Sequence, residues 1–271
     1  PEIIDALRSS QILPDRTVAI SIDDAFRSVY DKAWPRLREA GLPFTLFIAT
    51  KAVDRKSRNH MSWEQIRKLR DAGVTIGSQT HMHLHMPTNT RLRNEADINA
   101  SNRRFIDELG VAPTLFAYPY GEMSLEVRAT IRDAGFLAAF GQHSGVAHSN
   151  SDRYFLPRFA FNEAYGGLDR LRIAVNALPL PVYDITPADP LITQNPPVFG
   201  FSVDPTMDNL NRIACYNTQQ GRLHLERLGN RRIELRFSKA LSKGRARINC
   251  TLPASDRRWR WFGHQFFIKI D

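Results

Sequence analysis

The chain has 271 residues with a net charge of +9, 42% hydrophobic residues, 24% charged residues and two cysteines. This composition excludes a disordered chain and a disulfide-dense miniature, and the length predicts one large or two modest domains, each able to bury a core. The longest apolar runs, such as residues 44–50, have the length of buried strands and fall short of the roughly 20 residues that cross a bilayer, which argues against an integral membrane protein.

Apolar strand candidates alternate with helix candidates in the first part of the chain. The strand candidates cover residues 17–22, 45–49, 74–77, 115–118, 137–140 and 155–161. Alternation of this kind is typical of parallel strands with helices outside, so the sequence predicts an α/β fold in the form of an α/β barrel. In such a barrel the active site lies at the carboxyl ends of the strands.

Three of the intervening helices carry end signals. Ser62 and Gln65 have the spacing of a capping box, and an apolar stripe follows them until Gly73. A second helix is predicted over 95–109 and a third over 124–134, each followed by a glycine that stops it.

A proline-rich stretch follows the alternating region and divides the chain. Its prolines are Pro179, Pro181, Pro187, Pro190, Pro196, Pro197 and Pro205. Proline interrupts helices and favours extended backbone, so we expect a first domain over 1–178, a linker over 179–197 and a β-rich second domain over 198–271.

The second domain has short alternating runs separated by turn residues, which predict a small β-sandwich. The runs cover 212–216, 231–237, 245–252 and 258–268. Residues 182–271 also hold 14 Lys and Arg against 8 Asp and Glu, which accounts for +6 of the net +9. A basic surface attracts an anionic envelope or polymer, or simply keeps a protein soluble. Because no zinc-finger, RNP or basic-leucine-zipper pattern accompanies it, we expect no nucleic-acid partner.

Two residue pairs in the second domain leave alternatives open. Trp259 and Trp261 fall on one face of a predicted strand, where they either fill the core or an interdomain seam or stack against sugar rings. Cys215 and Cys250 either form one disulfide, if the protein is exported, or remain two small buried side chains. The sequence opens without a methionine, so a missing signal peptide does not argue against export.

Two adjacent carboxylates, Asp23 and Asp24, end the first strand candidate. Consecutive side chains on a strand point in opposite directions, so one carboxylate can bind a metal while the other acts as a general base. The alternative is that one of them caps the following helix.

Three histidines follow the strand candidate at 74–77. His81, His83 and His85 lie within five residues, and neutral imidazoles together with a carboxylate suit zinc or a similar divalent ion. The alternative is a surface loop whose histidines bind nothing.

A third polar site follows the strand candidate at 115–118, where Pro119, Tyr120 and Gly121 form a predicted turn. Such a turn can aim a backbone N–H at a bound oxyanion. The alternative is a turn that only reverses the chain.

Taken in order, these three sites resemble the motifs of the polysaccharide deacetylases, carbohydrate esterase family 4, which share the NodB homology domain. The family motifs Thr-Phe-Asp-Asp-Gly, His-Ser/Thr-x-x-His and Arg-Pro-Pro-Tyr-Gly correspond to residues 21–25, 79–83 and 117–121. The resemblance covers residues 16–162 and implies a distorted (β/α) barrel with fewer than eight regular units. The Tyr-Pro-Tyr-Gly version is most similar to the branch that acts on exported poly-N-acetylglucosamine.

The resemblance implies metal-dependent removal of acetyl groups from a polysaccharide. It makes Asp23 the general base, Asp24 and His83 metal ligands, and the backbone N–H of Tyr120 a donor to the oxyanion. The expected cofactor is a divalent metal ion, zinc first, with cobalt, nickel and iron as alternatives.

The sequence departs from the family in its metal ligands. Gln79 replaces the first metal-binding histidine, and its neutral amide oxygen is a poorer zinc ligand, so metal affinity should fall unless His81 or His85 substitutes. The spacing of His81 and His85 equals that of the family pair, although residues 76–78 favour His83.

Two further departures concern proton transfer. Ala117 replaces the arginine that braces the base; Arg158 is the candidate to supply that cation, and a surface or interdomain salt bridge is its alternative role. The family's late histidine, which protonates the leaving group, is not found before the proline-rich stretch, and His143 and His148 are the candidates to replace it.

Three hypotheses follow. The first is a periplasmic or extracellular deacetylase of an N-acetylated or O-acetylated polysaccharide, with 1–178 as catalytic domain, 198–271 as accessory domain and attraction to an anionic envelope. The second is a catalytically impaired glycan-binding or scaffolding protein on a deacetylase barrel. The third keeps the barrel and its chemistry but hydrolyses small cyclic amides. Bound metal separates the first from the second.

Overall fold

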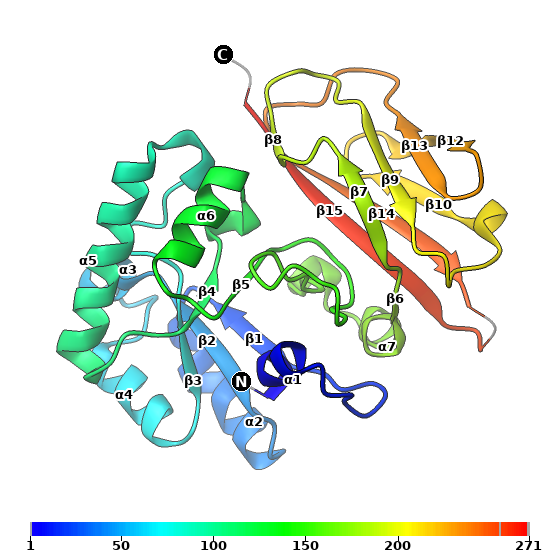
Figure 1. The fold of residues 1–271 in the computed structure, drawn as a ribbon. Helices are drawn as coiled ribbons and strands as arrows, with labels where there is room; N and C mark the ends of the chain where they lie inside the picture. The colour runs from blue at the N-terminus through cyan, green and yellow to red at the C-terminus, as the bar shows by residue number, and fades with distance from the viewer. Residues whose placement is uncertain (1, 255, 270–271) are drawn as a thin grey trace. The chain divides into compact units, whose positions relative to one another are not determined.

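A computed structural model of the chain describes residues 2–254 and 256–269 (Figure 1). The chain divides into two compact units. The first comprises Pro1–Pro119 and Glu126–Ala139, and the second comprises Tyr120–Leu125 and Phe140–Asp271. Within the described residues, no helix combines the length and the hydropathy needed to cross a lipid bilayer.

The first unit is built on a five-stranded sheet. Its strands are β1 (Ile20–Asp23), β2 (Phe44–Ile48), β3 (Thr75–Ser78), β4 (Leu115–Ala117) and β5 (Ala138–Phe140). They lie in the order β1-β2-β3-β4-β5, and β1 to β4 pair in parallel. Parallel neighbours need long crossover connections, which here supply the helices.

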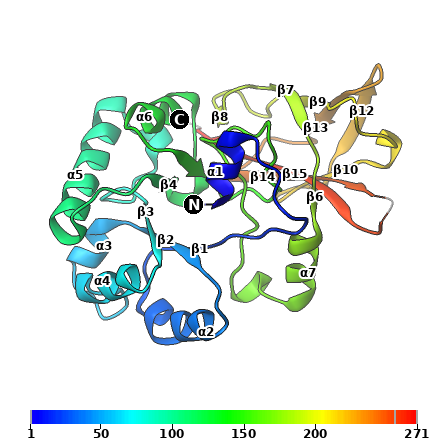
Figure 2. The ribbon, with the colours of Figure 1, turned by 60° about the horizontal axis from the view of Figure 1, so that its bottom comes forward.

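The helices of the first unit include short and long members. They are α1 (Glu2–Ser9), α2 (Trp34–Glu39), α3 (Thr50–Asp54), α4 (Trp63–Asp71), α5 (Arg91–Leu109) and α6 (Leu125–Asp133), whose first residue belongs to the second unit. Figures 1 and 2 show α3, α4 and α5 on the same side of the sheet.

The core of the first unit follows from the alternation of side chains along β2. Leu46 and Ile48 are fully buried and belong to one apolar cluster with Phe105 of α5. Burying side chains of this size contributes about 1.5–3 kcal/mol each. Phe47 points to the opposite face of the sheet, where it covers Gly77 so closely that a Cβ at that position would collide with its ring.

The predicted α/β architecture of parallel strands and helices is confirmed, and so is the predicted start of α4. The Ser62 hydroxyl accepts a hydrogen bond from the Gln65 N–H (3.3 Å), and the Gln65 side chain accepts one from the Ser62 N–H (3.0 Å). The second predicted helix begins at Arg91 rather than at 95, because Thr90 caps it there.

The predicted strand over 155–161 is wrong. In this range only Leu156 makes a β-bridge, a parallel one with Phe140. The next residue, Pro157, has no N–H with which to extend a ladder, and the Arg158 N–H donates to the carbonyl of His143 (2.9 Å). The parallel sheet therefore has five strands instead of the six candidates.

The second unit contains one complete α-helix, α7 (Leu168–Asn176), among its described residues, together with the strands of two sheets. The strands are β6 (Leu178–Pro179), β7 (Val182–Thr186), β8 (Leu191–Ile192), β9 (Phe199–Val203), β10 (Ala214–Asn217), β11 (Gly221–Arg222), β12 (His224–Leu228), β13 (Arg232–Arg236), β14 (Gly244–Pro253) and β15 (Trp259–Ile268). One sheet has the order β11-β10-β14-β15-β6, with β8 also paired to β15, and the other has the order β12-β13-β9-β7.

The two sheets enclose one apolar core, as predicted for a β-sandwich. Phe201 of β9, Ile233 of β13, Ile248 of β14 and Phe266 of β15 are all fully buried in it. The four predicted runs correspond to β10, β13, β14 and β15 to within two residues at each end. The remaining strands were not predicted.

Cys215 and Cys250 form a disulfide between opposed positions of β10 and β14. The Cys215 carbonyl accepts a hydrogen bond from the Leu223 N–H, on the side of β10 that faces away from β14. The two cysteines are therefore a non-hydrogen-bonded pair, the kind in which side chains of adjacent antiparallel strands lie closest. Of the two alternatives for these cysteines, the structure has the disulfide.

The proline-rich stretch contributes strands to the sandwich. β7 and β8 lie within 179–197, the expected linker, and pair with β9 and β15. Because β7 is an edge strand, the prolines that follow it do not interrupt a central ladder. The assignment of 1–178 as a catalytic domain and 198–271 as an accessory domain stays a prediction.

The two tryptophans of β15 lie outside the apolar core of the sandwich. Trp259 is 44% exposed. The Trp261 N–H donates to the side-chain oxygen of Asn249 (3.0 Å), and its ring meets that of Phe159 edge-on. The alternative that both indoles fill the sandwich core is therefore wrong.

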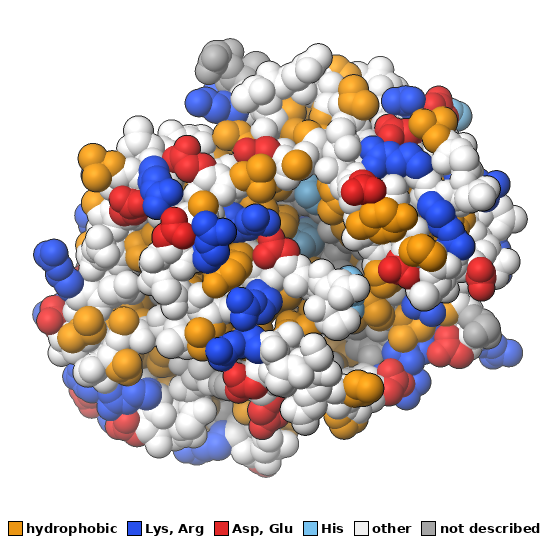
Figure 3. Space-filling model, viewed as in Figure 1, with side chains coloured by type: hydrophobic (Ala, Val, Ile, Leu, Met, Phe, Trp, Pro, Cys, Tyr) orange, Lys and Arg blue, Asp and Glu red, His pale blue; other side chains and the backbone are white. Residues whose placement is uncertain are grey.

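Basic and acidic side chains are interspersed on the face shown in Figure 3. Basic and acidic side chains also pair locally, such as Arg91 with Glu95 (2.7 Å) in the first unit and Arg236 with Glu226 (2.8 Å) in the second. Exposed pairs of this kind contribute little to stability, because solvent screens their charges. This pattern agrees with a solubilising surface, and attraction to an anionic envelope stays a prediction.

Candidate active site

The first carboxylate pair lies where β1 ends. Asp23 is its last residue and stands opposite Phe47 of β2, and the Asp24 N–H donates to the Phe47 carbonyl (3.0 Å). Asp24 and Ala25 then take positive φ angles of 74° and 49°, so the backbone turns sharply out of the sheet. Residues 27 and 28 are already helical ahead of the π-helical turn at Val29–Ala33, and Ser28 makes no side-chain cap. The alternative role of one of these carboxylates as a helix cap stays a prediction.

The histidine loop, residues 79–85, follows β3 at the same edge of the sheet. The Gln79 N–H donates to the Ile48 carbonyl at the end of β2 (2.9 Å). Thr80 has a φ of 66° and His83 a φ of 58°, and the Thr80 hydroxyl accepts a hydrogen bond from the His83 N–H (3.0 Å). Since the carboxyl ends of parallel strands meet at one edge, this loop lies beside the carboxylates that follow β1.

Neighbouring elements hold the histidine loop through its backbone. The N–H groups of Thr50 and Lys51 donate to the carbonyls of Thr80 (3.1 Å) and His81 (3.0 Å). On the other side, the carboxylate of Asp97 on α5 accepts from the Met82 N–H (3.0 and 3.2 Å). Asp97 is 7% exposed. Sequence reasoning missed this residue, although an acid among the buried residues of a predicted helix is a usable signal.

The structure brings His83 and Asp24 together. His83 Nε2 lies 3.6 Å from Asp24 Oδ1, and the side chains are 22% and 40% exposed. Burial lowers the pKa of His83, and the negative charges of Asp24 and Asp23 oppose that shift without cancelling it. The imidazole is therefore neutral at pH 7, with a lone pair available to a metal ion.

His81 and His85 are placed differently from His83. His81 Nδ1 lies 2.8 Å from the Thr50 hydroxyl, in hydrogen-bond contact. His85 is exposed, and its carbonyl accepts from the Thr88 hydroxyl (2.8 Å). His83, the ligand preferred from the sequence frame, lies beside Asp24. Roles for all of these residues as metal ligands stay predictions.

Gln79 is the remaining candidate ligand. Its side chain is 1% exposed, and its amide oxygen accepts no hydrogen bond within the described residues. Burying such an acceptor without a partner costs about 1–3 kcal/mol. No group of three or more His, Cys, Asp and Glu is arranged to hold a metal in 2–254 and 256–269. Carboxylate, neutral imidazole and amide oxygen together are nevertheless a donor set that fits a divalent ion.

The turn predicted to supply the oxyanion donor follows β4 directly. Tyr120 has a φ of 59°, and Gly121 has a φ of 69°. Two consecutive left-handed residues make a tight reversal, in which a non-glycine residue such as Tyr120 costs about 1 kcal/mol. Tyr120 belongs to the second unit, and its role stays a prediction.

Arg158 and His143, the candidates for cation and acid, also lie in the second unit. Arg158 donates from Nε to the Gly141 carbonyl (2.9 Å). His143 is 5% exposed; burial and then the positive charges of His264, Arg247 and Arg158 lower its pKa to about 3. A neutral, buried imidazole has no readily lost proton at pH 7, which argues against His143 as the general acid.

His148, the other candidate acid, is partly buried. Burial lowers its pKa, and the charge of Asp204 opposes the shift. Its Nδ1 accepts from the Asn150 N–H (3.3 Å). Nothing in these contacts distinguishes it as an acid, and its role stays a prediction.

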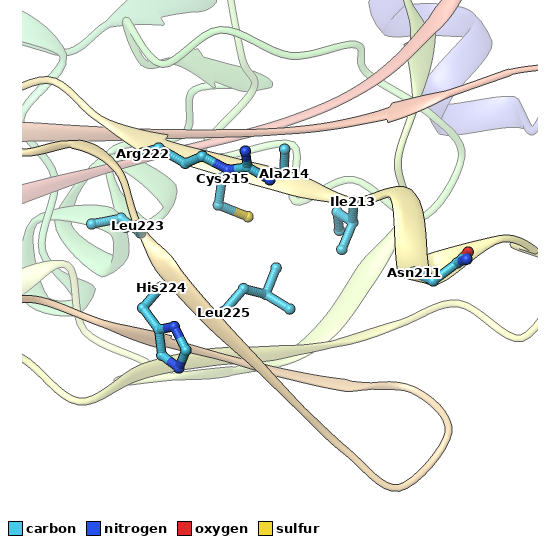
Figure 4. A pocket seen from close by; sticks show the side chains of 8 residues that line it. All are labelled: Asn211, Ile213, Ala214, Cys215, Arg222, Leu223, His224 and Leu225. Atoms are coloured by element: carbon cyan, nitrogen blue, oxygen red, sulfur yellow. The ribbon is translucent and has the colours of Figure 1, made fainter.

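A cavity of about 380 Å³ lies within the second unit, and none of the candidate site residues lines it (Figure 4). Residues of β10 form one side and residues 223–225 the other. Its lining residues are Asn211, Ile213, Ala214, Cys215, Arg222, Leu223, His224 and Leu225.

Comparison with known proteins identifies the first unit. Residues 10–139 match the sequence profile of the polysaccharide deacetylase family. This segment belongs to that family. It contains Asp23, Asp24 and His83 and ends where the first unit ends, at Ala139. The resemblance expected from the three motifs is confirmed.

Individual relatives agree with this assignment. The poly-beta-1,6-N-acetyl-D-glucosamine N-deacetylase of Staphylococcus aureus is 25% identical over 162 residues, covering 55% of this chain and 56% of the relative. The structure of IcaB from Ammonifex degensii is 26% identical, covers 60% of this chain and 75% of that chain, and has a TM-score of 0.55. The deacetylase PplD of Streptococcus pyogenes is 17% identical, covers 58% of this chain and 70% of that chain, and shares the fold at a TM-score of 0.55. The chain spans about half the length of the curated relatives it matches.

Proposed function

We propose that the chain is a metal-dependent deacetylase that removes acetyl groups from an N-acetylated polysaccharide, with β-1,6-linked poly-N-acetylglucosamine as its substrate. The observation that carries this proposal is the pairing of His83 with Asp24, beside Asp23, inside the segment of the deacetylase family. The substrate is inferred from the name of the Staphylococcus aureus relative.

Asp24 and His83 would hold the metal ion, with the amide oxygen of Gln79 as the third ligand. When bound, the ion supplies polarisation of the acetyl carbonyl and a lowered pKa of water. The backbone contacts of the histidine loop to α5 and to Thr50 hold His83 in place before the ion arrives. Such preorganisation reduces the cost of binding.

Asp23 is the proposed general base. Its carboxylate oxygen takes a proton from the attacking water as the water oxygen bonds to the acetyl carbon. The backbone N–H of Tyr120 then donates to the oxygen that becomes negative. Breakage of the carbon–nitrogen bond releases acetate, and the proton taken by Asp23 passes to the leaving amine.

The second candidate, a glycan-binding protein on an impaired deacetylase barrel, is favoured by Gln79. A neutral amide in place of an imidazole weakens a zinc site. The two candidates differ in metal content: an enzyme retains about one ion per chain at pH 7, and an impaired barrel retains none.

We also propose a periplasmic or extracellular location. The disulfide between Cys215 and Cys250 supports it, since disulfides persist in oxidising compartments. A protein purified from the cytoplasm with both thiols reduced and full stability would contradict this location.

The test of function is acetate release from β-1,6-linked N-acetylglucosamine oligomers, compared with acetylated xylan and a small cyclic amide. We expect release from the first substrate, with about one metal ion per chain. The variant Asp24→Ala should lose both the metal and the activity. Full activity of this variant, or no acetate from any polysaccharide, would show the proposal to be wrong.

A further inference from the structure

The sheet of the C-terminal strands carries side chains that reach the turn at Tyr120. Gln265 on β15 is 2% exposed, and its side-chain N–H donates to the Tyr120 carbonyl (3.1 Å). The two residues are 145 positions apart in the chain. Tyr120 and Gln265 both belong to the second unit.

Gln265 is itself held in one orientation. Its side-chain oxygen accepts from Nε of Arg247 (2.7 Å), which stands opposite it on β14. The Arg247 guanidinium donates also to the side chain of Gln142 (3.3 Å). Because its oxygen is engaged by a cation, the amide of Gln265 must turn its N–H group toward Tyr120.

Neighbouring side chains of β14 hold the same turn. Arg245 is on the same face as Arg247, two residues along the strand. Its guanidinium lies 5.5 Å from the centre of the Tyr120 ring, within cation–π distance, and 3.8 Å from the carboxylate of Glu122. Glu122 is 2% exposed. The residues on both sides of Gly121 are thus tied to the β-rich sheet.

The turn is also packed against backbone. A Cβ on Gly121 would lie 2.6 Å from the backbone nitrogen of Gln142. A Cβ on Gly263 of β15 would collide with the carbonyl of Ser144. Two glycines therefore allow residues 120–122, residues 142–144 and β15 to approach one another closely.

We infer that Gln265 is a positioning residue for the proposed deacetylation: by binding the Tyr120 carbonyl it holds Tyr120 in the left-handed conformation, and the φ and ψ of that conformation set the direction of the Tyr120 N–H. The inference rests on the proposed function of that N–H as oxyanion donor. The β-rich sheet then supports the residue that carries this N–H within the second unit, a role that differs from that of an attached binding domain.

The test uses an isosteric change. Gln265→Glu keeps an oxygen for Arg247 but replaces the N–H that donates to Tyr120. Gln265→Asn keeps the amide but shortens it by one methylene group. Gln220→Glu is the matched control, because the Gln220 side chain also donates to a backbone carbonyl of the second unit, that of Lys239 (2.8 Å).

One readout is independent of activity. The sequence contains only two Tyr–Gly bonds, Tyr120–Gly121 and Tyr165–Gly166. Protein labelled with carbonyl-13C tyrosine and 15N glycine therefore gives two resonances that connect these atoms. Gln265→Glu should shift the Tyr120 resonance and leave the Tyr165 resonance in place.

The second readout is turnover of the acetylated oligomer with zinc added. Both Gln265 variants should lower kcat at least about tenfold, because a misplaced oxyanion donor loses part of the 10²–10³-fold that such a donor supplies. KM should stay within about twofold, and Gln220→Glu should match the wild type in both readouts.

Three outcomes would overturn the inference. If the Tyr120 resonance does not shift in either variant, Gln265 does not hold the Tyr120 carbonyl. If the resonance shifts but kcat stays at the wild-type value, Gln265 has no positioning role, and the proposed function is unaffected. If the wild type is inactive, both the proposed function and the positioning role are wrong. If Gln265→Glu does not fold, as judged by its thermal melting, Gln265→Asn decides.

Discussion

The two units position their candidate functional groups by different means. In the first, Asp24 and His83 follow parallel strands that end at one edge, and local backbone contacts place them. In the second, Tyr120 is held by Gln265 from a strand 145 residues later. Placement at the ends of parallel strands is visible as motif spacing, whereas placement by a distant antiparallel sheet leaves no spacing to find.

The largest expected effect tests the first unit alone. Asp23→Asn removes the proposed base without changing the shape of the side chain, so kcat should fall by about 10²–10⁴-fold. Metal content and melting temperature should not change. The control is Asp31→Asn, an exposed carboxylate of the same unit that pairs with Arg27 (3.3 Å). Acetate release and metal analysis measure the outcome, and wild-type kcat in Asp23→Asn contradicts the assigned role.

The second effect tests the sandwich. Replacing Cys215 and Cys250 together by Ala removes a cross-link that spans 35 residues, and the free energy of unfolding of the second unit should fall by about 2–4 kcal/mol. Chemical denaturation monitored by tryptophan fluorescence measures it. Metal affinity of the first unit should remain unchanged. If the double variant also loses metal affinity, the metal site of the first unit depends on the stability of the second unit, which contradicts this prediction.

The sequence predicted those parts of the molecule in which local pattern decides structure. The capping box at Ser62 and the carboxylates after β1 follow from periodicity and strand ends. The proximity of His83 to Asp24 was implied by the resemblance to the deacetylase motifs. The strand over 155–161 fails because Pro157 cannot extend a ladder. Its apolar residues had the right composition for a strand but lacked the hydrogen-bond donor.

Other features depend on contacts that no short segment encodes. Asp97 holds the histidine loop from α5, 15 residues beyond Met82. The strands β7 and β8 form inside a proline-rich stretch because β9 and β15 offer them edges for pairing. Proline content predicts poor helices, but it does not say whether an edge strand finds a partner.

A third change sharpens the metal site of the first unit. Gln79→His restores an imidazole at a buried position whose amide oxygen has no hydrogen-bond donor within the described residues. Zinc affinity should rise at least about tenfold, which corresponds to about 1.4 kcal/mol. Isothermal titration with zinc measures it, and Gln11→His, at an exposed position of the same unit, is the control. Unchanged affinity would place Gln79 outside the metal site.

The last prediction is a pH dependence of the stability of the second unit. His143 and His264 are both 5% exposed, and burial is the main cause that lowers their pKa values to about 3 and about 4. Unfolding returns both to the usual range near 6.5. The unfolded state therefore binds more protons between pH 6.5 and 4, so stability is complete above pH 6.5 and falls as the pH decreases.

Within that window, each of these histidines should lower the free energy of unfolding by up to about 1.4 kcal/mol for each unit by which the pH decreases. His264→Phe keeps a ring beside Phe199, on which the imidazole stacks with ring centres 5.3 Å apart. This variant should lose the contribution of His264 to the pH dependence of the free energy of unfolding and keep that of His143. His224→Gln, at a position 72% exposed in its side chain, is the control and should leave the pH dependence unchanged. Denaturant titrations at several pH values measure both. If the free energy of unfolding of His264→Phe depends on pH as steeply as that of the wild type, His264 does not contribute to the acid sensitivity of the sandwich.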